Sequence, residues 1–321
     1  MKKKKIKSLI FGISGQDGSY LSHFLINKEH DVCGTTRNSS KKNLKNLARL
    51  GILRKVKIIK CNITDFLAVK KLIKIIKPDE IYYLCGNSSV TQSFTNPADS
   101  FKSNTLGLLN ILDTVKKTNK KIKIFNAVSG QFYGNKKSSV YNEKSYIDPQ
   151  SPYGVSKASS FWLTKIFREW YGIKCCSGIL FNHESPLRSN EFVTKKIINS
   201  SKLIKKGKLK HLYLGNINIY RDWGWAPEYV EAMYLMLRQK NPKDLVIGSG
   251  KRHSLRGFVY EVFKLLNISR SSLKINVKKL MRKRDIRTYK ADPKLAKKIL
   301  KWKAKTSFKQ IIYKMVNEQL Y

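Results

Sequence analysis

The clearest candidates for chemistry in this sequence are a tyrosine and a lysine four residues apart, Tyr153 and Lys157, in the run YGVSK. Residues at this spacing project from one face of a helix. The lysine can hold the ribose of a nicotinamide cofactor and, with the cofactor's positive charge, lower the pKa of the phenol. Tyr153 then becomes a base for a sugar hydroxyl as hydride leaves, and Ser129, at the end of the preceding predicted strand, completes a catalytic triad.

A glycine-rich turn, GISGQDG, lies near the start of the chain, after one predicted strand and before a predicted helix. Glycines at this spacing permit a tight turn and let backbone N–H groups approach a pyrophosphate at the helix N-terminus. We therefore expect this turn to bind a dinucleotide. The residues expected to contact it are Gly12, Gly15, Gln16, Asp17 and Gly18.

The end of the second predicted strand favours NADP over NAD. An acidic residue at this place would bind the ribose 2′-hydroxyl of NAD, whereas an arginine pairs with the 2′-phosphate of NADP. The run here is TTRNSS, with Arg37 and Ser39 and without a carboxylate. The alternative is that Arg37 is one more solvated base in a basic protein. Asp65, after the third predicted strand, is placed either to meet the adenine amine or to cap the helix that follows it.

Strands and amphipathic helices alternate through the first half of the chain, which predicts an α/β fold with a Rossmann-type, doubly wound parallel sheet. Strands are expected in SLIFGI, DVCGTTR, KVKIIKCNI, DEIYYLCG, KIKIFNAVS and IKCCSGILFN, and helices in GSYLSHFLINK, FLAVKKLIKIIK, SNTLGLLNILDTVKKT and PYGVSKASSFWLTKIFREWYG. After about Phe181 the alternation weakens, with helices expected in EFVTKKIINSSKLIKKG, APEYVEAMYLMLRQ and DPKLAKKILKWK and a strand in LVIGSG. We therefore expect residues 1–180 to form an NADP-binding domain that carries the catalytic residues, and residues 181–321 to form a smaller, mixed α/β, mainly substrate-binding region.

The formal net charge is +44, from 65 Lys and Arg against 21 Asp and Glu. Such a charge invites a nucleic-acid hypothesis, but the lysines are spread over the whole length instead of being concentrated among aromatic residues. We therefore expect no specific nucleic-acid partner. An anionic substrate such as a nucleotide diphosphate suits the same sign of charge.

The cysteines and the apolar runs indicate where the protein works. The five cysteines are odd in number and lie mostly in strand-like runs, which indicates reduced core residues in a cytoplasmic protein. Cys175 and Cys176 are adjacent, so in a strand they face opposite sides. The apolar runs are too short to cross a bilayer. His183 and Glu184 lack a third ligand nearby in the sequence, and no metal site is expected.

Longer motifs give the chain a resemblance to a known family. They are FGISGQDGSYL, SPYGVSKAS, GILFNHESP, EFVTKKI, RDWGWAPEYVEAMYLML and ADPKLAKKILKWKAKTSF, and they extend over nearly the full length. With them the chain resembles the GDP-mannose 4,6-dehydratases, extended short-chain dehydrogenases that prepare deoxysugars for surface glycans. The resemblance implies a tightly bound NADP, a GDP-hexose substrate and a homodimer or homotetramer.

The resemblance also implies roles for single residues. Guanosine and diphosphate contacts are implied for Asn182, Arg188, Lys195, Arg221 and Arg282, with Lys195 in place of the arginine usual in FVTRK. Contacts near the sugar and pyrophosphate are implied for Ser88 and Ser93, although the loop CGNSS departs from the usual AAQSH. The alternative for any single arginine is surface charge, which the Trp and Gly of RDWG make less attractive for Arg221.

One departure from the family concerns the reaction itself. Family members carry a glutamate two residues after the catalytic hydroxyl, as in STSELYG, where this chain has VSGQFYG and therefore Gln131. Family dehydratases oxidise C4 of the hexose, use that glutamate to take the C5 proton, expel the C6 hydroxyl and return the hydride to C6. A glutamine amide cannot serve as that base at neutral pH.

Three hypotheses remain open at this point. The first is a GDP-mannose 4,6-dehydratase-like enzyme that transfers hydride at C4. The second is a GDP-sugar C4 dehydrogenase, reductase or epimerase, in which Gln131 orients the sugar without dehydration. The third is a catalytically inactive Rossmann module used for binding, against which the intact Tyr153 and Lys157 argue. The sequence also leaves open whether Glu143 or Glu184 reaches C5 in place of the missing glutamate.

Overall fold

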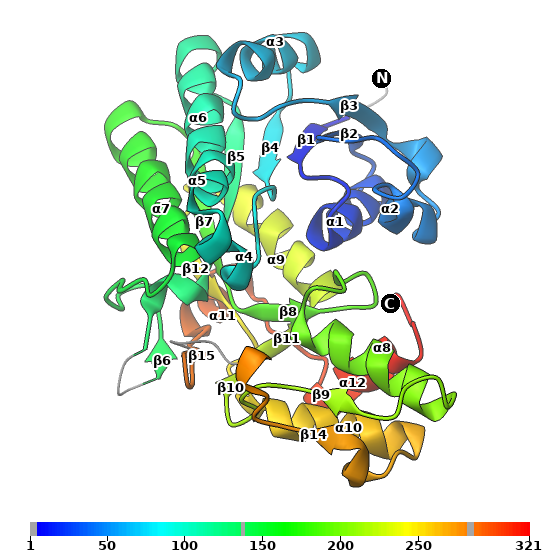
Figure 1. Cartoon of the computed structure of the whole chain (residues 1–321). Helices are drawn as coiled ribbons and strands as arrows, with labels where there is room; N and C mark the ends of the chain where they lie inside the picture. The colour runs from blue at the N-terminus through cyan, green and yellow to red at the C-terminus, as the bar shows by residue number, and fades with distance from the viewer. Residues whose placement is uncertain (1–4, 136–138, 281–285) are drawn as a thin grey trace.

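A seven-stranded parallel sheet runs through the centre of the protein in a computed structural model that describes residues 5–135, 139–280 and 286–321 (Figure 1). Its strands, in sheet order, are β12 (Leu245–Ile247), β7 (Cys175–Leu180), β5 (Lys123–Ser129), β4 (Glu80–Tyr83), β1 (Lys7–Phe11), β2 (Asp31–Thr36) and β3 (Lys57–Lys60). From β1 the chain winds outward to β3, then returns to β4 on the other side of β1 and continues to β12. This order confirms the predicted doubly wound, Rossmann-type sheet, whose direction of winding reverses between β1 and β4.

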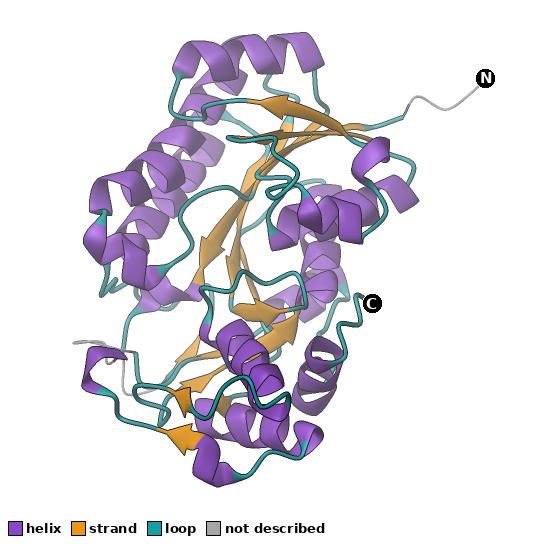
Figure 2. Ribbon diagram, turned by 45° about the vertical axis from the view of Figure 1, so that its right-hand side comes forward, coloured by secondary structure: helices purple, strands orange, loops and turns teal. Residues whose placement is uncertain are grey.

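Helices cover both faces of the sheet (Figure 2). One face carries α1 (Gln16–Asn27), α2 (Lys45–Arg49), α9 (Ala226–Arg238) and α11 (Lys294–Leu300), and the other carries α3 (Phe66–Ile76), α5 (Pro97–Phe101), α6 (Gly107–Thr118) and α7 (Pro152–Tyr171). Because strand side chains alternate between faces, Cys176 packs in the first core and Cys175 in the second. The prediction that these adjacent cysteines face opposite sides is therefore confirmed.

A smaller region lies beyond the carboxyl ends of the strands (Figure 1). Its helices are α8 (Val193–Lys205), α10 (Leu255–Leu266) and α12 (Phe308–Val316), and its strand pairs are β8 (Asn182–Glu184) with β11 (Trp223–Trp225), β9 (Leu212–Tyr213) with β14 (Leu273–Lys274), and β10 (Tyr220–Arg221) with β13 (His253–Ser254). A separate apolar core, which includes Ile197, Trp223, Phe258 and Ile311, holds them together. The sequence did not predict α10 or α12.

The chain passes between the two regions more than once. After β8 and α8 it returns to the sheet as α9 and β12, and β12 pairs with β7. Residues 226–247 therefore belong in space to the Rossmann part. The boundary expected at residue 180 does not separate the two regions, because the sheet is completed by a strand from the second half of the chain.

No helix within the described residues is long and apolar enough to span a membrane.

Candidate active site

A cavity of about 1010 Å³ is lined by residues from the carboxyl ends of the strands and from the smaller region. Its wall includes residues of the loop after β4, the ends of β5 and β7, the first turns of α7, and Arg221 from β10. Among the described residues that line it are Ser88, Ser129, Gln131, Tyr153, Lys157, Asn182, Arg188 and Arg221. In open α/β sheets, ligands bind in this crevice at the carboxyl edge.

The start of helix α7 places the tyrosine and the lysine. Ser151 caps this helix by accepting a hydrogen bond at its hydroxyl from the backbone N–H of Gly154, at 3.1 Å, and Pro152 occupies the first turn. Tyr153 and Lys157 thus lie one turn apart on the buried side of α7, and both line the cavity. Ser129 ends β5 at the same wall. The structure therefore brings the three predicted catalytic residues together.

Burial dominates the electrostatics of these groups. It raises the pKa of Tyr153, while a hydrogen bond with the Ser129 hydroxyl and the charge of Arg188 partly offset it. Burial also lowers the pKa of Lys157 to about 8, and its ammonium donates a hydrogen bond to the Ala127 carbonyl at 2.9 Å. The Lys157 nitrogen lies 5.9 Å from the centre of the Tyr153 ring. The lowered phenol pKa expected from the sequence requires the positive charge of the cofactor and stays a prediction.

The glycine-rich turn is shaped for close approach of a backbone to a ligand. Gly12 has φ +92°, and a Cβ at Gly18 would lie 2.2 Å from the Gly12 carbonyl oxygen. Gly15 is the N-cap of α1, and no side chain accepts a hydrogen bond from the first N–H groups of this helix. A turn that only glycine can form, at the start of a helix and beside the cavity, fits the pyrophosphate of a dinucleotide.

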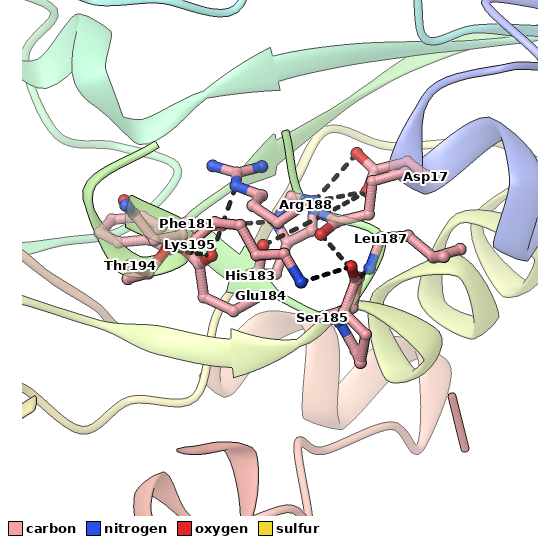
Figure 3. Close-up of polar contacts among 12 residues, drawn as sticks. Asp17, Phe181, His183, Glu184, Ser185, Leu187, Arg188, Thr194 and Lys195 are labelled. Carbon is pink, nitrogen blue, oxygen red and sulfur yellow. Dashed lines mark hydrogen bonds and ion pairs between the residues drawn. The ribbon is translucent and has the colours of Figure 1, made fainter. Parts of the chain in front are cut away.

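Two further residues of the turn hold the segment after β7 (Figure 3). Asp17 pairs with His183 at 2.9 Å, and the other ring nitrogen of His183 lies 2.8 Å from the Phe181 carbonyl. Burial alone would raise the pKa of Asp17, but His183 outweighs it and the pKa falls to about 2. The Gln16 amide donates to the His183 carbonyl at 3.2 Å and accepts from the Ser185 hydroxyl at 2.8 Å. This link was not predicted from the sequence, because the residues that form it are far apart in the chain.

The same segment supplies charged groups to the cavity (Figure 3). Glu184 lies 3.4 Å from the Arg188 guanidinium and accepts a hydrogen bond from Thr194 at 2.7 Å. The Arg188 guanidinium also stacks on the ring of Phe192, 3.5 Å from its centre. Glu184 is therefore held by an arginine and a threonine. Glu143, the other carboxylate considered for C5, accepts a hydrogen bond from the Val246 backbone N–H at 2.8 Å and is not part of the cavity wall.

Gln131 lies where the family carries its glutamate. It follows Ser129 in the short helical turn Gly130–Tyr133 and lines the cavity. Its side-chain nitrogen donates a hydrogen bond to the hydroxyl of Tyr289 at 3.0 Å. The group at this place is thus a neutral amide held by a buried phenol.

Comparison with known proteins decides the family. A family model described as GDP-mannose 4,6 dehydratase matches residues 9–315. A relative described as GDP-mannose 4,6 dehydratase 1, from Arabidopsis thaliana, is 37% identical over 331 residues, which cover 100% of this chain and 91% of the relative. The chain belongs to the GDP-mannose 4,6-dehydratase family.

Solved structures of other proteins share the fold of this GDP-mannose 4,6-dehydratase family member. A dTDP-glucose 4,6-dehydratase from Bacillus anthracis, in complex with NAD, matches with a TM-score of 0.85 and 19% identity, covering 98% of this chain and 96% of the other. A protein named RMD from Pseudomonas aeruginosa, complexed with NADPH, matches with a TM-score of 0.80 and 18% identity, covering 98% of each chain. At these identities the likeness concerns the fold alone.

Two residues predicted from the resemblance to the GDP-mannose 4,6-dehydratases, Ser93 and Lys195, do not line the cavity. Ser93 is buried in α4 (Val90–Thr95) and donates its hydroxyl proton to the Val90 carbonyl at 2.7 Å. The other predicted serine, Ser88, does line the wall, as does Ser89. Lys195 is not part of the wall, because the Pro186 carbonyl at 3.0 Å and Glu318 at 3.2 Å hold its ammonium. Arg282 lies outside the described residues.

The predicted adenosine contacts of this family member lie near the glycine-rich turn. Arg37 and Ser39 are exposed just after β2, and the charge of Arg37 acts on Cys85 beside Gly12. Asp65 caps α3 by accepting a hydrogen bond from the Ala68 N–H at 3.1 Å, as one of its two interpretations expected. Its contact with adenine stays a prediction. Within the described part of the chain, no three His, Cys, Asp or Glu side chains gather as a metal site would require.

Proposed function

We propose that this protein is a cytoplasmic, NADP-dependent nucleotide-sugar 4,6-dehydratase that acts on GDP-mannose. The observation that supports this most strongly is the position of Ser129, Tyr153 and Lys157 on one wall of a cavity. The same cavity is also lined by Asp17, in the glycine-rich turn, and by Arg221. Membership of the family over residues 9–315 supports the substrate. The intact triad argues against an inactive binding module.

The end of β2 supports NADP as the cofactor. Arg37 and Ser39 follow the strand, without a carboxylate to bind the 2′-hydroxyl of NAD. Solved proteins of this fold contain NAD or NADPH, so the fold by itself does not choose between them. Arg37 is exposed and therefore accessible to a 2′-phosphate.

Each residue of the triad has its own role in the reaction at C4 of the hexose. The chemistry that NADP supplies when bound is the acceptance of a hydride from C4. Tyr153 takes the proton of the C4 hydroxyl, and Ser129 donates a hydrogen bond to the same oxygen. The ammonium of Lys157 favours the phenolate form of Tyr153 by its charge. Arg188 and Arg221 both lie on the cavity wall, and their guanidinium groups bind the diphosphate.

Gln131 is the specific reason to keep a second candidate function, redox chemistry at C4 without loss of water. A general base contributes about 10²–10⁴ in rate, so an amide at this place should slow removal of the C5 proton strongly while C4 oxidation continues. Glu184 is engaged by Arg188 and Thr194, and Glu143 lies off the cavity wall. Neither of these carboxylates is free to replace the base.

The test is to incubate the purified protein with GDP-mannose and NADP and to follow the sugar nucleotide by mass spectrometry. Loss of one water by the unmodified protein establishes the dehydratase. Oxidation or hydrogen exchange at C4 without water loss, with water loss appearing in Gln131→Glu, establishes the second function. Tyr153→Phe serves as the inactive control in both cases, and no reaction by any variant would contradict both functions.

Family membership also supports a homodimer or homotetramer in solution, which analytical ultracentrifugation would distinguish.

A further inference from the structure

A tyrosine that the sequence did not single out lies directly behind Gln131. Tyr289 is 1% exposed, and its hydroxyl contacts two residues of the cavity wall. It accepts a hydrogen bond from the side-chain nitrogen of Gln131 at 3.0 Å and donates one to the side-chain oxygen of Asn182. One phenol thus joins two amides that come from different halves of the chain.

The hydrogen bonds of this phenol fix which way the Gln131 amide faces. A phenol has one proton to donate, and Asn182 accepts it. The nitrogen of Gln131 therefore has to supply the second hydrogen bond, which commits it to Tyr289. No described residue donates a hydrogen bond to the side-chain oxygen (Oε1) of Gln131. This acceptor is therefore left for a ligand in the cavity.

Tyr289 is itself held rigidly. Its ring packs on Phe181 at 5.1 Å between centres, and the Arg221 guanidinium lies 5.1 Å from the ring centre. It directly precedes β15 (Lys290–Ala291), which pairs with β6 (Val140–Tyr141), and the Ala291 N–H donates to Asp222 at 3.1 Å. Burial raises the pKa of Tyr289 to about 12, so the phenol keeps its proton near neutral pH.

We propose that Tyr289 is a positioning residue that holds Gln131 as a fixed hydrogen-bond acceptor for a hydroxyl of the bound hexose. The inference rests on the proposed function, because it needs the sugar of a nucleotide sugar to lie beside Ser129 and Tyr153. An amide oxygen accepts a hydroxyl proton in a hydrogen bond and does not remove it. Tyr289 therefore acts on recognition and orientation of the sugar, and it acts through Gln131.

The test compares binding of GDP-mannose with binding of GDP, by calorimetry in the presence of NADPH, which cannot accept a hydride and so prevents turnover. Tyr289→Phe keeps the ring and its packing and removes the hydroxyl. Because the hydrogen bond that orients Gln131 is lost, we expect affinity for GDP-mannose to fall about 3- to 10-fold more than affinity for GDP. Any loss through Asn182, to which Tyr289 also donates a hydrogen bond, is common to both ligands. Tyr141→Phe is the matched control, since it removes a buried hydroxyl that bonds to the Gly134 carbonyl at 3.2 Å, away from the cavity wall.

A double-variant cycle separates positioning from a general structural role. In a Gln131→Met background the extra loss for GDP-mannose over GDP disappears, because the Gln131 amide that Tyr289 holds is gone. Equal affinities for Tyr289→Phe and the unmodified protein would overturn the inference. So would an equal loss for GDP and GDP-mannose, or an additive cycle.

A failure of Tyr289→Phe to fold and a failure of the proposed substrate can each be told apart from a failure of the inference. If Tyr289→Phe fails to fold, exchange of the Gln131 side-chain amide protons in the unmodified protein decides the matter by NMR, with Gln131→Met for assignment: slow exchange supports the bond to Tyr289, and free exchange overturns it. If the unmodified protein binds GDP-mannose no more tightly than GDP, the proposed substrate is wrong, and the inference fails with it. Binding of GDP-mannose with no effect of Tyr289→Phe overturns the inference alone.

Discussion

Arg37 is the residue on which the proposed choice of cofactor depends. It is exposed at the end of β2, and Ser39 follows it. Because a charge-assisted hydrogen bond to a phosphate is lost, we expect Arg37→Ala to weaken NADPH binding about 10-fold and to leave NADH binding nearly unchanged, measured by fluorescence titration. Arg54→Ala, which removes another exposed arginine of the same region, controls for net charge. Equal losses for both cofactors would show that Arg37 contributes only general attraction.

The predicted site residues that the structure brings to one place are those whose partners lie close by in the chain. Tyr153 and Lys157 share one helix, and Gly12 and Gly18 share one turn. Tyr289 and His183 were not recognised as site residues, because the bond from Tyr289 to Asn182 spans 107 positions and the pair of His183 with Asp17 spans 166. Ser93 does not line the cavity, since one turn of helix decides whether a serine faces the cavity or its own backbone.

At the scale of elements, the end of the chain joins α2 to α8 through Glu318. This carboxylate lies 2.8 Å from Arg49 of α2, and 2.9 Å and 3.2 Å from Lys202 and Lys195 of α8. Burial alone would raise its pKa, but hydrogen bonds from Lys202 and Arg49 outweigh burial and lower the pKa from 4.5 to about 2. Arg49 and Lys195 also donate to the Pro186 carbonyl, so the link extends to the segment that carries Arg188.

We expect Glu318→Gln to lower the free energy of unfolding by about 1 kcal/mol near neutral pH, a value kept small because the carboxylate is partly exposed to solvent. A carboxylate with a lowered folded pKa stabilises fully above its ordinary pKa of 4.5, and this stabilisation is lost as the pH falls through 4.5 toward 2. Urea unfolding at several pH values, and in about 1 M salt, measures both effects. Glu231→Gln, at an exposed glutamate of α9, makes the same change in net charge. A difference that persists below pH 2 would contradict an ionic origin.

For the whole molecule, sequence patterns predicted the sheet, but they did not predict that α9 and β12 return to it from the second half of the chain. The strands of the sheet are short apolar runs, and each such run was recognised. The boundary at residue 180 followed the loss of regular alternation, but such a change along the chain does not say where later elements pack. The charge of +44 is likewise a property of the whole surface, and it favours the approach of any polyanion, nucleotide sugars included.

The return of α9 and β12 to the sheet predicts that residues 1–180 cannot fold alone. In the intact protein, α9 buries Met233, Met236 and Leu237 against the core that contains Leu21 and Leu25 of α1. Leaving three large apolar side chains without this contact forfeits roughly 5–9 kcal/mol, which is comparable to the whole stability of a typical domain. We expect the 1–180 fragment to lack near-ultraviolet circular dichroism and a cooperative urea transition, both of which the full chain should show. A sharp transition in the fragment would mean that its six strands of the central sheet and α1 form a sufficient core without α9, and that the two regions are independent after all.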